Sequence, residues 1–109
     1  MHFQTFSHTV KATGNGSANR FVTFAGTLAG AASTVLGVAK TAFKTGGLFV
    51  ADVIGVTAVE AGGAIANGAE ITPDANGRAI TAPEDATNVV GRAVSAASGA
   101  GDQVFILIR

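Results

Sequence analysis

The chain has 109 residues, enough for one domain with a hydrophobic core of its own, and its seven basic and seven acidic side chains are scattered. Without a basic stripe it lacks the electrostatic footprint of a nucleic-acid-binding protein, and without Cys it has no disulfide, thiolate chemistry or cysteine-ligated metal. Seven Phe, no Trp or Tyr, and many Ala give a thin core, which predicts a domain that gains stability from partner subunits.

Strand patterns dominate the first half of the chain. Apolar and polar residues alternate over 5–12, which predicts a half-buried strand. His8 lies on the apolar face of this strand, so we expect a partly buried strand residue rather than a metal ligand. Short strands are expected at 21–24 and 35–39. The segment 48–59 is apolar on both faces, which predicts a long strand in the centre of a sheet.

The clearest local signal in the second half is a hairpin. Its strands, 69–72 and 78–81, flank a loop that contains Pro, Asp, Asn and Gly, the residues that favour tight turns. The spacing of Thr, Pro and Glu over 81–84 matches a capping box and predicts one helical turn. Strands at 88–97 and 103–108 complete the set.

These elements predict an all-β fold with one or two short helical turns. The expected architecture is a small β-barrel or β-tulip-like sandwich of short antiparallel strands. Within this single domain, residues 1–20 form an N-terminal arm and first strand, and residues 21–109 form the barrel. The pattern of Val35–Ala39 recurs at Val89–Ala93 with low identity, which indicates β architecture rather than a repeat array.

No catalytic constellation is present in the sequence. His2 and His8 have no neighbouring carboxylates, no serine-nucleophile motif occurs, and the Gly-rich segment at 14–16 lacks the further Gly of a nucleotide fingerprint. Asp52 and Glu60, in or beside the long strand, are expected to form a salt bridge or a subunit contact. We therefore predict a protein that is not an enzyme and has no catalytic residue, cofactor or metal site.

A membrane segment is also not expected. Residues 21–39 are uncharged, but Thr, Ser and Gly dilute their apolarity well below that of a spanning helix. The first residues lack the basic and apolar regions of a signal peptide, which predicts a soluble protein made in a cytoplasm.

The N-terminal segment Met1–Phe6 carries two Phe with no charge between them. It is either a plain core strand or an arm that adds a strand to the sheet edge of a neighbouring subunit. On the second interpretation, the candidate partner-binding residues are His2, Phe3, Gln4, Thr5 and Phe6.

A set of small motifs recurs in order along most of the chain. They are a Val-x-Gly-Val-Ala strand at 35–39, a loop ending at Gly46–Gly47, a strand at 48–55, a hairpin at 68–81, Val90–Ala93 and an apolar strand at 103–109. With these motifs the chain resembles the small capsid cement, or decoration, proteins of tailed bacteriophages. Their usual Gly-Asp-rich first hairpin is replaced here by residues 1–20. The order of elements also resembles the trimeric lambda-type head decoration protein.

The resemblance implies a structural virion protein on the capsid exterior, made in the host bacterial cytoplasm. Such a protein binds the outer surface of a phage capsid and cements contacts between major capsid protein subunits. Its partners would be the major capsid protein and further copies of itself, as a homotrimer or a dimer, with no nucleic acid, membrane or small-molecule substrate. The alternative is another phage module, such as a tail or host-glycan-binding domain, although glycan sites normally use Trp or Tyr.

Overall fold

Eight antiparallel strands make up the described part of the structure, which contains no helix, so the expected all-β class is confirmed. The computed structural model describes residues 6–31, 33–83, 86 and 88–108. The strands are β1 (Phe6–Lys11), β2 (Phe21–Thr23), β3 (Val35–Ala39), β4 (Leu48–Glu60), β5 (Glu70–Pro73), β6 (Ala79–Thr81), β7 (Gly91–Ala93) and β8 (Gln103–Ile108).

Most strands lie where the sequence predicts them, with bounds that agree to within one residue. The segment 88–97 is the exception, because only Gly91–Ala93 belongs to the sheet. After β7 the chain leaves the sheet, and Ala97 forms an isolated bridge with Ile65. The helical turn expected at 81–84 falls partly on residues outside the described part of the chain.

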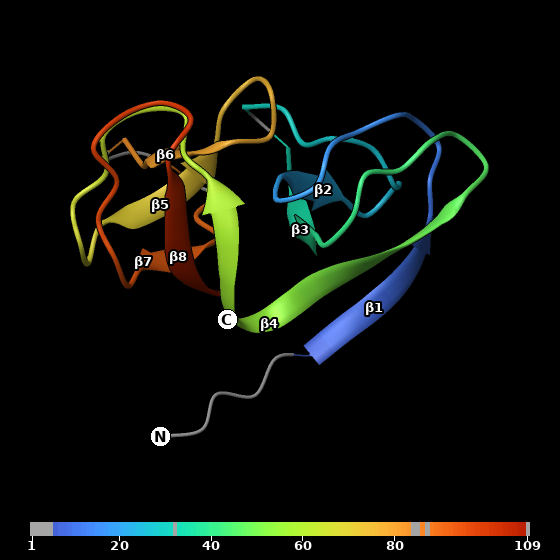
Figure 1. Cartoon of the computed structure of the whole chain (residues 1–109), viewed down its shortest axis with the longest axis horizontal. Coiled ribbons are helices and arrows are strands. Elements are labelled where there is room, and N and C mark those ends of the chain that lie inside the picture. The colour runs from blue at the N-terminus through green and yellow to red at the C-terminus, as the bar shows by residue number, and fades with distance from the viewer. Residues whose placement is uncertain (1–5, 32, 84–85, 87, 109) are drawn as a thin grey trace.

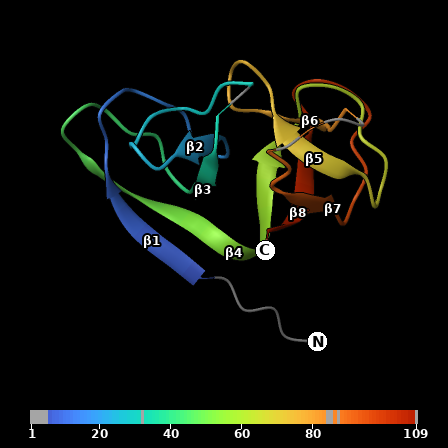
Figure 2. The same cartoon turned by 180° about the vertical axis from the view of Figure 1, so that it is seen from behind.

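Strand β4 passes from one half of the molecule to the other and bends on the way (Figure 1). Its first half pairs with β1 and β3, whereas its second half, from Gly55 onward, pairs with β8. Gly55 has a φ of 115°, which residues with a Cβ rarely adopt, so glycine permits the bend. The sheet has the order β2-β3-β4-β8-β7-β5-β6, with β1 beside β4, and curls into the expected barrel-like shape. Figure 2 shows the same two halves from behind.

The two halves share one backbone plan, and we name them the N-terminal repeat (residues 6–54) and the C-terminal repeat (residues 55–108). β1 pairs with the first half of β4, and the second half of β4 pairs with β8 in the same register. Strands β2, β3 and β4 are related to one another as β5, β7 and β8 are. Among the cross-strand pairs, Lys11–Leu48 corresponds to Glu60–Gln103, and Thr9–Val50 corresponds to Ala58–Phe105. In the same way, Phe21–Val38 corresponds to Glu70–Arg92, and Ala39–Ala51 corresponds to Ala93–Ile106.

The loops follow the same plan as the strands. Matched loop contacts are the bridges Gly16–Phe43 and Ile65–Ala97, and the backbone hydrogen bonds from Asn19 to Ala39 and from Gly68 to Ala93. The sequence echo of 35–39 at 89–93 is therefore part of a duplicated fold, and not only a sign of β architecture. The loop after β7 is one residue longer than the loop after β3, so Val50 corresponds to Phe105.

Each repeat has a buried hydrophobic core. In the N-terminal repeat, the rings of Phe43 and Phe49 stack with centroids 4.2 Å apart. The core of the C-terminal repeat also takes in Phe21, Ala29 and Val38 from the N-terminal repeat. Phe21 is fully buried there, and a Phe buried in this way stabilises a fold by about 1.5–3 kcal/mol. Packing of these three residues therefore joins the two repeats.

A buried carboxylate reinforces the junction between the repeats. Asp52 is 3% exposed and accepts hydrogen bonds from the hydroxyls of Ser7 and Thr57, each at 2.8 Å. The ammonium group of Lys40 lies 3.1 Å from the same carboxylate. Asp52 thus ties β1 to both halves of the bent strand β4. At the matched position of the C-terminal repeat the residue is Leu107, so this polar cluster is specific to the junction.

A second ion-pair network connects the repeats at the surface. The carboxylate of Glu60 lies 3.2 Å from the guanidinium of Arg20 and 3.6 Å from that of Arg78. Arg78 also pairs with Asp74 at 3.3 Å. The expected salt bridges of Asp52 and Glu60 are both confirmed. Because the side chains of Arg20 and Glu60 are partly exposed, solvent and salt weaken the contribution of this network to stability.

Two matched glycines test the duplicated plan. A Cβ on Gly37 would collide with the carbonyl oxygen of Asp52, and one on Gly91 with that of Leu107, because β3 and β7 approach their neighbours equally closely. We expect Gly37→Ala and Gly91→Ala each to lower the free energy of unfolding by about 1–3 kcal/mol, measured by urea denaturation. The matched control Gly99→Ala has open space around it and should change little. Equal effects at all three positions would contradict the close approach.

The Asp52 cluster gives a second prediction. Asp52→Ala leaves the hydroxyls of Ser7 and Thr57 without their acceptor, so the free energy of unfolding should fall by about 1–3 kcal/mol. Glu70→Ala removes an exposed carboxylate and should change the stability by no more than about 0.5 kcal/mol. Thermal denaturation of both variants measures the difference. A loss in Glu70→Ala as large as that in Asp52→Ala would show that burial of the carboxylate is not the cause.

Candidate docking surfaces

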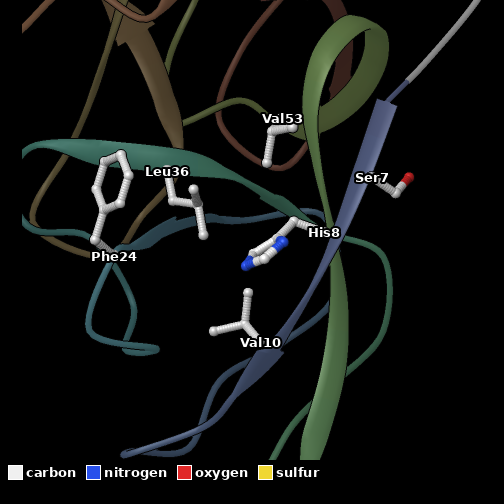
Figure 3. A pocket seen from close by; sticks show the side chains of 6 residues that line it. All are labelled: Ser7, His8, Val10, Phe24, Leu36 and Val53. Carbon is white, nitrogen blue, oxygen red and sulfur yellow. The ribbon is translucent and has the colours of Figure 1, made fainter.

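An apolar groove lies beside β1 in the N-terminal repeat. Alternation along β1 turns His8 and Val10 to the same side, toward Leu36 of β3 and Val53 of β4 (Figure 3). Gly37 allows β3 to lie close against β4, which brings Leu36 near Val53. The cavity has a volume of about 410 Å³, and its lining residues are Ser7, His8, Val10, Phe24, Leu36 and Val53.

The groove is open to solvent. Phe24, at its edge, is 68% exposed, which is unusual for an aromatic side chain. His8 is also exposed, so the expectation that it is partly buried is wrong. The alternation of β1 predicts its face correctly, but that face is not covered at this point. An open apolar groove with few polar groups is suited to binding another protein rather than to catalysis.

A second apolar surface is formed by exposed side chains of the first half of β4, and we call this surface the outer face of β4. Leu48, Val50 and Ile54 are 71%, 40% and 49% exposed. The apolar pattern on both sides of the long strand correctly predicts its central place in the sheet. It does not predict that these three side chains of its first half are exposed to solvent.

A smaller cavity in the C-terminal repeat has a polar character. Its volume is about 190 Å³, and it is lined by Glu70, Val89, Val90, Gly91 and Arg92. Glu70 and Arg92 are opposite each other on β5 and β7 and are both exposed. This face of the C-terminal repeat therefore carries charge where the matched face of the N-terminal repeat carries Phe21 and Val38.

The described residues contain no cluster of three or more His, Asp or Glu that could hold a metal ion. In the same part of the chain, no helix has the length and apolarity needed to span a membrane. The carboxylate of Asp102 lies in an exposed turn, where a hydrogen bond from the Ser98 hydroxyl holds its pKa below the usual value. This hydrogen bond has a local role in the turn before β8.

The residues that the sequence singled out for partner binding lie at the start of the chain. His2, Phe3, Gln4 and Thr5 are outside the described residues. The backbone of Phe6 begins β1 and is opposite Ile54 of β4. Sequence analysis did not find the groove, because its lining comes from four separate segments. The pairing of His8 and Val10 on one strand face was the only local signal of it.

Open apolar surfaces on an all-β domain are typical of binding and assembly modules. The family model for phage cement proteins matches residues 2–109, so the chain belongs to the phage cement protein family. No curated protein matches the sequence.

Among solved structures, the N base of the head fiber protein gp8.5 of bacteriophage phi29 has a similar fold. The TM-score is 0.74 at 24% identity, and the match covers 97% of this chain and 95% of that one. Both the family and this structural neighbour are phage structural proteins. A capsid-associated, virion-located structural role follows for this chain.

Proposed function

We propose that this protein binds the outer surface of a phage capsid and cements contacts between major capsid protein subunits. Its membership of the phage cement protein family is the observation that carries the proposal. The open apolar groove and the exposed face of β4 support it, because both are surfaces of a kind that binds protein. The protein acts without catalysis, at the capsid exterior, after synthesis in the host bacterial cytoplasm.

The N-terminal arm makes the first contact with the shell in this proposal. Its residues are His2, Phe3, Gln4, Thr5 and Phe6, which belong to the arm and first strand at 1–20. The barrel of residues 21–109 carries this arm. Among the described strands, β1 pairs only with β4, so its other edge is available to a strand of the shell. A shell strand added there would gain backbone hydrogen bonds beside the arm.

Because many copies attach to one shell, a modest contact area for each copy is sufficient for attachment. An interface of about 800 Å² on each partner is of ordinary size for a specific complex. When copies associate with one another, the second attachment becomes intramolecular and strengthens the first. A decoration protein therefore gains from self-association, and we propose a homotrimer formed through the outer face of β4.

Removal of the arm tests its role. We expect a chain without Met1–Thr5 to keep its fold, because β1 begins at Phe6, and to lose attachment to shells. Shells assembled from the major capsid protein of the same phage are mixed with each chain and sedimented. Circular dichroism and thermal denaturation of the shortened chain serve as the folding control. Attachment equal to that of the full chain would remove the arm from the mechanism.

The oligomeric state provides a separate test. Light scattering should give the mass of a trimer for the full chain. Ile54→Lys places a charge on the outer face of β4 and should shift the protein toward monomer, because burial of an unpaired ammonium is costly. Val94→Lys changes a similarly exposed residue of the C-terminal repeat and should leave the mass unchanged. A full chain that is monomeric at high concentration would contradict the proposal, and the mass of a dimer would correct it.

A further inference from the structure

The duplicated fold shows how a groove of this kind is filled. The matched positions of His8, Val10, Leu36 and Val53 in the C-terminal repeat are Thr57, Val59, Val90 and Ile108. These four residues mark where the corresponding groove of the C-terminal repeat would lie. Unlike its counterpart beside β1, that groove is closed.

The N-terminal repeat itself closes the second groove. Phe21 and Val38, from the paired strands β2 and β3, share one buried cluster with Val59 and Ile108. Val59 is fully buried and Ile108 is 5% exposed. A two-stranded segment that presents one aromatic and one aliphatic side chain is therefore the natural occupant of this groove.

Hydrogen bonds at the same place hold the β2–β3 segment in register against the C-terminal repeat. The backbone amide of Glu60 donates to the carbonyl oxygen of Asn19, and the amide of Phe21 donates to that of Gly77. Thr57 donates to the carboxylate of Asp52. The occupant is thus bound by apolar burial together with backbone and side-chain hydrogen bonds, the combination that characterises recognition of β segments.

A second copy of this chain does not present the corresponding surface. Its own Phe21 and Val38 are fully buried within the molecule. The matched positions of its C-terminal repeat carry Glu70 and Arg92. Insertion of that face would bring a carboxylate and a guanidinium into an apolar groove, at a large cost in desolvation. Head-to-tail association of copies through this groove is therefore disfavoured.

We infer that the open groove is the receptor for a β-hairpin of the shell subunit that carries an aromatic and an aliphatic side chain on one face. This inference rests on the proposed function and assigns it a second contact beside the arm. The volume of about 410 Å³ is many times the roughly 30 Å³ of one water molecule, so the groove has room for side chains. The edge of β1 that pairs with no other described strand borders the groove and offers backbone groups to the incoming hairpin.

Two fold-neutral variants test the groove. Phe24→Asp places a charge at its edge, and His8→Trp obstructs it, while both residues are exposed and contribute little to the core. We expect each variant to weaken binding to purified shells of the same phage by about tenfold or more, as loss of a central apolar contact does. Phe105→Asp is the matched control, because Phe105 is an exposed aromatic residue of the C-terminal repeat, and its affinity should stay within about twofold of the unchanged chain.

A photo-crosslinking amino acid at position 24 identifies the occupant directly. In decorated shells, the crosslink should join this chain to a β-hairpin of the shell subunit, as read by mass spectrometry. Crosslinking to a second copy of the chain, unchanged affinity of both groove variants, or an equal loss in Phe105→Asp would each overturn the inference. If these results appear while the unchanged chain still binds shells, the proposed function stands without this contact. If the unchanged chain binds no shell, the proposed function fails and this inference with it.

Discussion

The structure depends on one strand, β4, that is shared by both halves of the sheet. β4 completes the core of the N-terminal repeat with its first half and begins that of the C-terminal repeat with its second. Because the two halves are covalently continuous, Gly55 fixes how the repeats meet, and the Asp52 cluster holds that bend on the inside. The apolar groove, the closed groove and the exposed face of β4 all take their places from this single bend. A side chain at position 55 would therefore affect every surface at once.

Much of the fold was predictable, because its signals are local. Alternation of apolar and polar residues predicted β1, a continuous apolar run predicted β4, and turn residues predicted the hairpin of β5 and β6. The duplication was not predictable from the sequence, because the two repeats share strand register and backbone hydrogen bonds but few identical residues. Only the echo at 35–39 and 89–93 showed it, through the glycines that let β3 and β7 approach their neighbours. The family resemblance gave the class of protein correctly for a related reason, because it depends on the order of such small motifs.

The docking surfaces were harder to foresee than the fold. Periodicity indicates which side chains share a face, but whether that face is covered depends on residues far away in the sequence. His8 and Thr57 occupy matched positions, yet Thr57 is 4% exposed and His8 lies open. What differs is the neighbour, since Phe21 and Val38 lie over one groove and no described segment lies over the other. Exposure of this kind is a property of the assembled pair of repeats.

Comparison of matched positions separates the residues that build each core from those that face outward. At positions that build each core, the residues stay apolar, as Val10 and Val59 or Ala12 and Ala61 show. At positions that face outward from a repeat, Phe21 and Val38 have Glu70 and Arg92 as counterparts. Charge on the outward face of the C-terminal repeat disfavours further stacking, as in the terminal units of repeat proteins. An apolar groove left open in the other repeat has no such protection, and an exposed Phe24 beside it is a liability for any protein free in solution. On the inference above, the groove is covered in the assembled particle, because the shell hairpin supplies the strands that Phe21 and Val38 supply to the C-terminal repeat.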